Sequence, residues 1–210
     1  MQFIKLVGGS IGTNCYLLEE NDKVILFDYV PEALEYVSSN NYTPEKIFLT
    51  HVHYDHFEGL YNFLDKYDVE LYMSDAAYSD INNDNITMRM ITPHANKKIS
   101  LVNSKKCLND DLIIWNNLEI KVFSSPGHSR CSVIYIIDKL KVVISGDTLF
   151  KMGVGRCDLP GGSQETMIQS ITTLFNNEKI NDYRVFPGHG PETTVEYEKQ
   201  YNPFCKGNVL

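Results

Sequence analysis

The amino-acid sequence repeats one order of predicted elements: a block of strands, a helix, a strand and a helix, and then the same order again. Strands are predicted at residues 2–7, 14–19, 23–27, 46–49, 71–72, 111–115, 118–123, 132–137, 141–145 and 183–186, and helices at 31–40, 60–67, within 74–98, at 163–175 and at 192–201. Each half can therefore form a sheet that helices cover on one side. Packing two such sheets face to face buries both apolar faces, which predicts an α+β protein with a four-layer αββα sandwich.

Length and composition favour one globular domain that spans residues 1–210. The chain is 43% apolar and 22% charged, values typical of globular proteins, and no low-complexity stretch or linker divides it. No stretch approaches the ~20 apolar residues of a membrane helix, and the N-terminal MQFIKLVGGSIGTN does not resemble a signal peptide. We therefore expect a cytoplasmic protein.

The formal net charge of −8 argues against two classes of partner. Proteins that bind nucleic acid normally present a basic surface to the phosphates, and anionic lipid headgroups attract the same charges. No Lys/Arg cluster in this sequence is longer than a pair. We therefore expect a small-molecule partner, with no nucleic acid and no membrane.

The five cysteines do not form a recognisable framework. Cys15, Cys107, Cys131, Cys157 and Cys205 are widely spaced, are odd in number and include no CxxC pair. This pattern differs from those of disulfide scaffolds and zinc ribbons. We expect reduced thiols that behave as small buried apolar side chains.

The strongest chemical signal is the segment HVHYDH, which supplies His51, His53, Asp55 and His56. In an extended segment, side chains alternate between two faces, so His51, His53 and Asp55 should share a face. Imidazole and carboxylate donors without thiolates suit zinc, iron or manganese, and they favour a catalytic site over a closed structural one.

Three further residues occur where a predicted strand ends and a loop begins. His128 lies in SPGHS, His189 in PGHGP and Asp147 in SGDTL. Each is a weak signal alone, but together with HVHYDH they supply seven ligands, about right for two ions that share a carboxylate. The sixth histidine, His94 in TPHAN, has no such neighbours, and we interpret it as structural or exposed.

The HxHxDH motif followed by His128, Asp147 and His189 resembles the metallo-β-lactamase superfamily, over essentially the whole chain. Within it, GDTLF, GVGRCDLPGGS at 153–163 and the terminal TTVEYEKQYNPF resemble short glyoxalase II-like hydrolases. The resemblance implies the αββα fold again. It also implies that one metal binds His51, His53 and His128, that the other binds Asp55, His56 and His189, and that Asp147 bridges them. Zinc is the expected metal, with iron or manganese as alternatives.

The expected reaction is thioester hydrolysis, for example of hydroxyacylglutathione. Two cations lower the pKa of a bound water toward ~7 and polarise a carbonyl oxygen, so a bridging hydroxide would attack the acyl carbon. Asp55 and Asp147 would orient that hydroxide as well as bind metal. With five histidines needed as ligands, no general acid is evident, which favours a thiolate leaving group with a pKa near ~8.5.

The sequence departs from the family pattern in three ways. Ser129 replaces the usual threonine and keeps a hydroxyl, and Glu58 stands where a glycine is common, which alters the rim of the site. The chain also ends about where full-length glyoxalase II enzymes continue into a helical domain that supplies much of their glutathione binding. The catalytic part of the resemblance therefore transfers better than the substrate part.

Five side chains near the motifs keep two interpretations each. Lys151 or Arg156 would bind a substrate carboxylate, or Arg156 would pair with Asp158 to hold its loop. Tyr54 would line the rim or pack. Cys157 and Cys131 are poor candidates for a nucleophile, since no spare histidine is available to activate a thiol.

Two alternative functions remain open at this stage. A persulfide dioxygenase-like oxidoreductase shares the ligand pattern but uses one iron held by two histidines and an aspartate; the complete second site and DLPGGS favour the hydrolase. An inactive binding module stabilised by metal is the alternative without catalysis, and the intact seven ligands argue against it. The charge disfavours a nuclease, and the expected location disfavours a lactamase.

Overall fold

The computed structural model describes residues 1–89 and 97–205, of which Cys205 is described by its backbone alone. His94 lies outside the described residues. The chain folds into two compact units, Met1–Lys106 and Cys107–Leu210, and each contains one six-stranded mixed sheet. The predicted α+β class is confirmed, while the single domain expected from the length stays a prediction.

The first unit is built on a sheet with the strand order β1-β2-β3-β4-β5-β6. Its strands are β1 (Gln2–Gly8), β2 (Thr13–Glu20), β3 (Lys23–Phe27), β4 (Thr43–Phe48), β5 (Glu70–Ser74) and β6 (Ser104–Cys107). Strands β1 to β3 run antiparallel, whereas β3, β4 and β5 run parallel. Four consecutive residues of β3 are fully buried, as expected for a strand covered on both faces.

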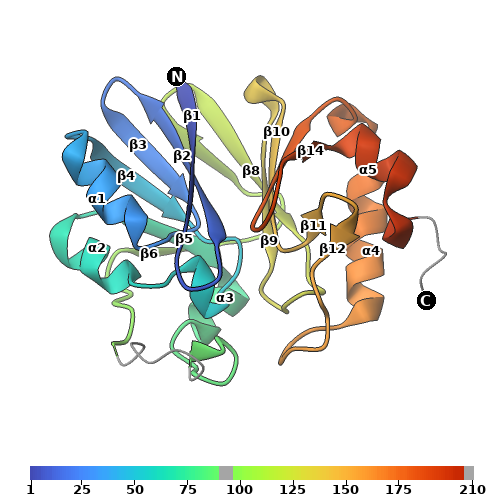
Figure 1. Ribbon diagram of the computed structural model, residues 1–210, viewed down its shortest axis with the longest axis horizontal. Coiled ribbons are helices and arrows are strands. Elements are labelled where there is room, and N and C mark those ends of the chain that lie inside the picture. Colours follow the sequence, from blue (N-terminus) through green and yellow to red (C-terminus); the bar gives the residue numbers. More distant parts are fainter. Residues whose placement is uncertain (90–96, 206–210) are drawn as a thin grey trace. The chain divides into compact units, whose positions relative to one another are not determined.

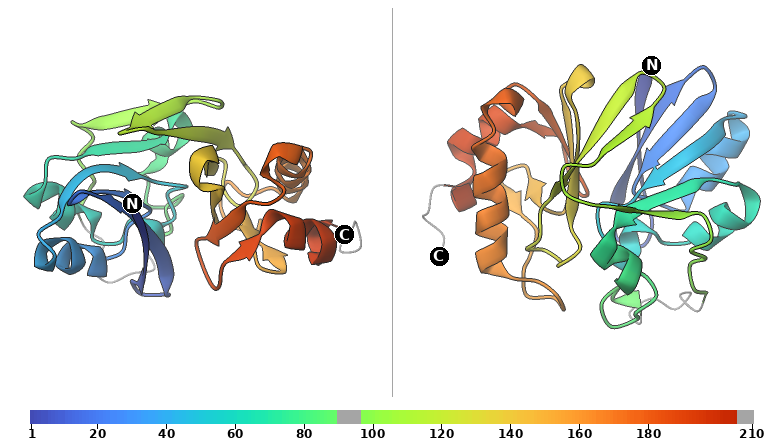
Figure 2. Two further views of the ribbon diagram at one scale, coloured as in Figure 1. Left: turned by 90° about the horizontal axis from the view of Figure 1, so that it is seen from above. Right: turned by 180° about the vertical axis from the view of Figure 1, so that it is seen from behind.

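Helices of the first unit follow its strands. They are α1 (Glu32–Ser39), α2 (Leu60–Lys66) and α3 (Asp75–Asp80), with a short 3-10 helix η1 (Tyr54–His56) after β4. Figures 1 and 2 show α1 and α2 along one side of the sheet. Helix α1 buries Ala33 and Val37, four residues apart, against it.

The second unit has the strand order β14-β13-β10-β9-β8-β7. These strands are β7 (Leu112–Trp115), β8 (Leu118–Ser124), β9 (Val133–Ile137), β10 (Val142–Gly146), β13 (Arg184–Pro187) and β14 (Thr193–Thr194). A hairpin of β11 (Leu149–Phe150) and β12 (Gly153–Val154) follows β10. The unit also contains the helices α4 (Gln164–Phe175) and α5 (Val195–Tyr201) and the short 3-10 helices η3 (Asp138–Leu140), η4 (Glu178–Ile180) and η5 (Pro203–Cys205).

Helix α4 begins where its sequence predicts. The Ser163 hydroxyl accepts a hydrogen bond from the backbone N–H of Thr166 at 3.3 Å, which caps the helix. Met167 and Ile171 on the inner face pack into the core with Leu174. Ile168 is 37% exposed because it lies about 100° away from Met167 around the helix.

The predicted elements are largely confirmed, with differences at short strands. The helix predicted at 192–201 begins only at Val195, since Thr193 and Thr194 pair with β13 instead. Strand β4 starts three residues earlier than expected. The short strands β6, β11, β12 and β14 were not predicted, because none of them follows a recognisable alternation of apolar and polar residues.

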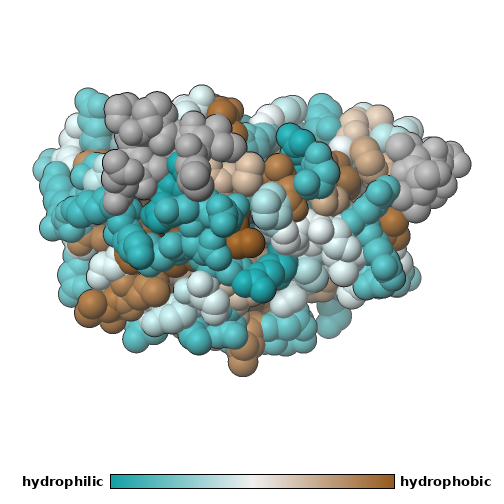
Figure 3. Space-filling view, turned by 90° about the horizontal axis from the view of Figure 1, so that it is seen from below, coloured by the Kyte–Doolittle hydropathy of each residue, from teal (hydrophilic) through white to brown (hydrophobic). Residues whose placement is uncertain are grey.

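The helices are short, and the surface seen in Figure 3 is mainly hydrophilic. None of the helices formed by the described residues is long and apolar enough to span a membrane. Seen from below, hydrophobic residues form separate patches within a mainly hydrophilic surface (Figure 3). No disulfide joins the four cysteines whose side chains are described, and Cys15, Cys107 and Cys131 are buried as predicted.

Candidate functional site

Four of the seven predicted ligands lie in the first unit, on the loop that leaves β4. Strands β3 and β4 are parallel, so their carboxyl ends meet at one edge of the sheet. Asp28 follows β3 there, and its backbone N–H donates to Phe48 at the end of β4 (2.8 Å). The left-handed backbone of Asp28 (φ 55°) ends the strand and leaves its carboxylate buried beside the loop.

The carboxylate of Asp28 organises this loop. It accepts hydrogen bonds from the backbone N–H of Thr50 (2.8 Å), from the Thr50 hydroxyl (2.8 Å) and from Nδ1 of His56 (2.8 Å). Since the Thr50 hydroxyl donates to Asp28, its oxygen is available to accept from Nδ1 of His51, 3.1 Å away. Both imidazoles therefore carry their proton on Nδ1 and keep the Nε2 lone pair for another ligand.

The loop is extended only as far as His53 (φ −69°, ψ 142°). Beyond it, the backbone N–H of His56 donates to the carbonyl oxygen of His53 (3.0 Å) and closes a 3-10 turn. The prediction that Asp55 shares a face with His51 through strand alternation was therefore wrong. The turn gathers the side chains in another way: the rings of His51 and His53 lie 4.7 Å apart, and those of His51 and His56 lie 4.1 Å apart.

Asp55 is held by a residue of another strand. The buried hydroxyl of Thr13, at the start of β2, donates to Oδ2 of Asp55 at 2.6 Å. The same oxygen lies 3.3 Å from Nε2 of His56. This hydrogen bond fixes the orientation of the Asp55 carboxylate.

The other three predicted ligands lie in the second unit, each after a strand. His128 follows β8, Asp147 follows β10 and His189 follows β13. Strands β10 and β13 are parallel, and β9 is antiparallel to both β8 and β10, so all three residues leave the sheet at one edge. Oδ2 of Asp147 lies 3.5 Å from Nε2 of His128 and 3.6 Å from Nε2 of His189.

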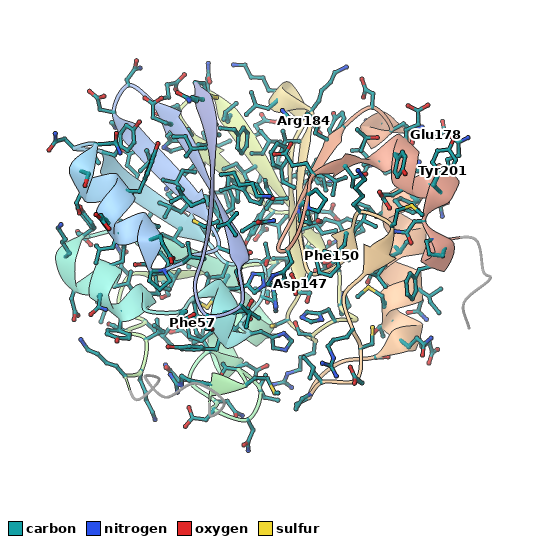
Figure 4. The ribbon with its side chains drawn as sticks, viewed as in Figure 1. Phe57, Asp147, Phe150, Glu178, Arg184 and Tyr201 are labelled. Atoms are coloured by element: carbon teal, nitrogen blue, oxygen red, sulfur yellow. The ribbon has the colours of Figure 1, made fainter. Side chains whose placement is uncertain are left out.

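His128 has its orientation set by the backbone. Its Nδ1 lies 2.7 Å from the carbonyl oxygen of Arg156, and since a carbonyl only accepts, Nδ1 carries the proton and Nε2 the lone pair. Gly155 makes this approach possible: a Cβ there would lie 2.0 Å from the Asp147 carbonyl oxygen and 2.9 Å from Nδ1 of His128. Phe150 packs edge-on against the ring of His189, and Figure 4 shows it near Asp147.

The donor sets in both units fit a divalent metal. Separations of 3.3–3.6 Å between imidazole nitrogens and carboxylate oxygens are longer than hydrogen bonds. Two ligands bound at about 2.0–2.2 Å to one tetrahedral ion stand roughly 3.4 Å apart, as these atoms do. Nitrogen and oxygen donors with hydrogen-bonded second partners are typical of zinc and iron sites.

Sequence reasoning missed the residues that hold the ligands. Asp28, Thr13 and Thr50 act through hydrogen bonds across the fold, and Arg156 acts through its carbonyl oxygen. Only Asp28 had a sequence signal, because a carboxylate directly after a buried strand is unusual. Glu58, expected at the rim, accepts from the backbone N–H of Ser10 (2.7 Å) and so braces the β1–β2 turn.

The structure also shows the contacts of three side chains near the motifs that had two interpretations each. Arg156 pairs with Asp158 through two hydrogen bonds of 2.6 Å, which confirms the interpretation that this pair holds the loop. Tyr54 is buried and packs edge-on against Phe57. Burial raises the pKa of the Cys157 thiol, the opposite of what a nucleophilic cysteine needs.

The sequence pattern of the Metallo-beta-lactamase superfamily matches residues 8–189, a range that includes all seven predicted ligands. The probable metallo-hydrolase YqgX of Bacillus subtilis is 33% identical, with 100% of both chains aligned. The hydroxyacylglutathione hydrolase GloC of Haemophilus influenzae is 27% identical over 91% of this chain and 92% of its own length.

Solved structures agree with the sequence matches. The BLEG-1 B3 metallo-β-lactamase superposes with a TM-score of 0.86 at 29% identity, covering 98% of this chain and 100% of that one. A di-iron-bound form of TTHA1623 gives a TM-score of 0.82 at 28% identity, covering 96% and 99%. These matches confirm the predicted αββα fold class, and the chain belongs to the metallo-β-lactamase superfamily.

Proposed function

We propose that this protein is a metal-dependent hydrolase that uses two divalent ions to cleave thioesters such as hydroxyacylglutathione. The observation that carries the proposal is the orientation of the imidazoles: three of them are held through Nδ1 so that Nε2 is the ligand atom. Membership of the superfamily supports the assignment of one ion to His51, His53 and His128 and the other to Asp55, His56 and His189, with Asp147 shared.

When bound, two divalent ions lower the pKa of a coordinated water and polarise a carbonyl oxygen. The residues of this chain supply the geometry. Asp28 and Thr50 hold His51 and His56, Thr13 holds Asp55, and the Arg156 carbonyl holds His128. Ligands fixed in this way keep the reacting groups in place without reorganisation during the reaction.

The leaving group favours a thioester. All five histidines among the described residues belong to the two clusters, so none of them remains to protonate a leaving group. A thiolate, with a thiol pKa near ~8.5, departs without a proton, whereas an amide nitrogen requires one. The name of the relative GloC supports glutathione as the thiol, and the di-iron form of TTHA1623 supports including iron in any reconstitution.

The test is hydrolysis of lactoylglutathione by protein reconstituted with zinc, iron or manganese. We expect a kcat/KM near or above ~10⁴ M⁻¹s⁻¹ with two ions bound per chain. His51→Ala should abolish turnover and lower metal content, while His94→Ala, a histidine outside the proposed ligands, should retain both. Equal loss of activity in the two variants would contradict the assignment.

Two parallel assays separate the alternatives. A chromogenic cephalosporin tests lactamase activity, which the BLEG-1 similarity makes worth measuring. Oxygen uptake with glutathione persulfide tests the dioxygenase-like alternative, for which one iron per chain should suffice. Faster turnover in either assay than with lactoylglutathione would overturn the thioesterase proposal, and full thioester turnover with one ion per chain would overturn the two-metal part.

A further inference from the structure

The second unit contains a cavity of about 780 Å³ between α4 and the segment of residues 154–158. Pockets that bind small organic ligands usually enclose about 300–1,000 Å³. None of the seven proposed metal ligands lines this cavity. It is therefore a separate candidate binding site.

The cavity is long and mostly apolar. Its lining includes α4 residues from Gln164 to Phe175 and then Asn176, a stretch of roughly 18 Å along the helix axis. Ile168 and Phe204 project into it while remaining 37% and 44% exposed. Apolar side chains that line a hollow and still face solvent gain free energy when an apolar ligand covers them.

One end of the cavity carries the ion pair of Arg156 and Asp158, both of which line it. The guanidinium of Arg156 donates to Asp158 through Nε and Nη2, and Nη1 donates to no atom among the residues that the structure describes. Residue 157 passes close to Gly162, because a Cβ on that glycine would lie 2.4 Å from the Cys157 carbonyl oxygen. This contact places Arg156 near the N-terminal end of α4, where an anionic group is also favoured.

We propose that this cavity binds an unbranched fatty acid, with its alkyl chain along α4 and its carboxylate on Nη1 of Arg156. An alkyl chain of about twelve carbons spans roughly 15 Å, which matches the length of the cavity along the helix. Because Nε and Nη2 are bonded to Asp158, Nη1 of Arg156 would donate a charge-assisted hydrogen bond to one oxygen of the fatty-acid carboxylate. Fatty-acid binding at this cavity does not depend on the proposed hydrolase activity, because binding is measured with no thioester present.

The test is calorimetric titration of the whole protein with dodecanoate and with dodecanol. We expect saturable binding of one dodecanoate per chain. Ile168→Trp, which fills the cavity from an exposed helix position, should weaken binding at least tenfold, and Thr172→Trp is a second blocking variant. Gln169→Trp, the adjacent exposed position outside this cavity, should bind like the wild type. Arg156→Gln should weaken dodecanoate severalfold and leave dodecanol unchanged.

Each other result counts against the proposal. No saturable binding of dodecanoate would overturn it. If Ile168→Trp and Gln169→Trp weaken binding equally, the ligand binds elsewhere. The same follows if neither Ile168→Trp nor Thr172→Trp weakens binding. If dodecanol binds as well as dodecanoate and Arg156→Gln changes neither affinity, the cavity is not a carboxylate site.

Discussion

Nδ1 of His56 lies 2.8 Å from Oδ2 of Asp28, and both side chains are almost completely buried. The same carboxylate accepts two hydrogen bonds from Thr50, whose hydroxyl in turn lies beside Nδ1 of His51. One buried carboxylate thus sets the orientation of two imidazoles that are proposed to bind different ions.

We expect Asp28→Asn to lower metal affinity by about 10- to 100-fold, as loss of a hydrogen-bonding partner of a ligand usually does. Asparagine tolerates the left-handed backbone (φ 55°), so the fold should persist. The amide group of asparagine would bring an N–H donor to a position where Thr50 and His56 also donate, so these hydrogen bonds cannot all form. Competition with a chelator measures the affinity, and thermal unfolding of the metal-free protein reports the fold. Wild-type metal affinity in a folded variant would contradict this role.

Substitutions at Thr13 can separate the effect of side-chain volume from the effect of the hydrogen bond to Asp55. Thr13→Val keeps the volume but removes the 2.6 Å hydrogen bond to Asp55, and a hydrogen bond to a charged group is worth about 1.5–3 kcal/mol. We expect metal content and kcat/KM to fall together. Thr13→Ser restores the hydroxyl and should restore both, whereas a purely steric role predicts that Val is tolerated better than Ser.

The seven candidate ligands could be named from the sequence because each stands in a local sequence pattern. HVHYDH packs four donors into six positions, and His128, Asp147 and His189 each follow a recognisable strand. Such patterns survive without knowledge of the fold, since they depend on residues close together in the chain.

The supporting contacts were not predictable for the opposite reason. Thr13 and Asp55 are forty-two positions apart, and only the pairing of strands brings them together. The contact between His128 and Arg156 uses a backbone carbonyl, which every residue has, so no side-chain pattern marks it. The 3-10 turn at Tyr54–His56 was also missed. A turn of three residues and an extended strand are both possible for so short a segment, and the sequence does not distinguish them.

Glu198 is a buried carboxylate without a metal role. It accepts from the Met152 backbone N–H (2.8 Å), from Asn202 (2.8 Å) and from the Thr193 hydroxyl (2.5 Å), and so ties α5 to the β11–β12 hairpin. Glu198→Ala leaves these donors unsatisfied and should cost about 3 kcal/mol of unfolding free energy in urea titrations. Glu196→Ala, exposed on the same helix, is the control and should change stability little.

The ion pair of Lys46 and Glu70 predicts a pH-dependent contribution to stability. The two residues are direct partners on β4 and β5, and the hydrogen bond from Lys46 holds the pKa of Glu70 below its usual value. Because the folded pKa is depressed, the contribution is present at neutral pH and is lost as pH falls through the folded pKa of Glu70. At 33% exposure it should be below about 1 kcal/mol.

Urea unfolding of the metal-free protein checks the sign. Glu70→Gln should be less stable than the wild type at pH 7, and the difference should vanish in acid, below the folded pKa. Glu119→Gln, on the exposed side of β8 with no ion pair among described residues, should show no such convergence. A difference for Glu70→Gln that grows toward acid would contradict the assigned direction.

Gly155 and Gly153 form a matched pair for testing the second-unit cluster. A Cβ at Gly155 would lie 2.0 Å from the Asp147 carbonyl oxygen, whereas one at Gly153 would meet nothing within 4 Å. Gly155→Ala must therefore displace the segment whose carbonyl holds His128, and displacements near 1 Å at a reacting site cost about 100-fold in rate. We expect Gly155→Ala to lose metal and to lower kcat/KM by that order, and Gly153→Ala to retain both. If both alanine variants keep full activity and metal content, the close packing around His128 is not what fixes this ligand.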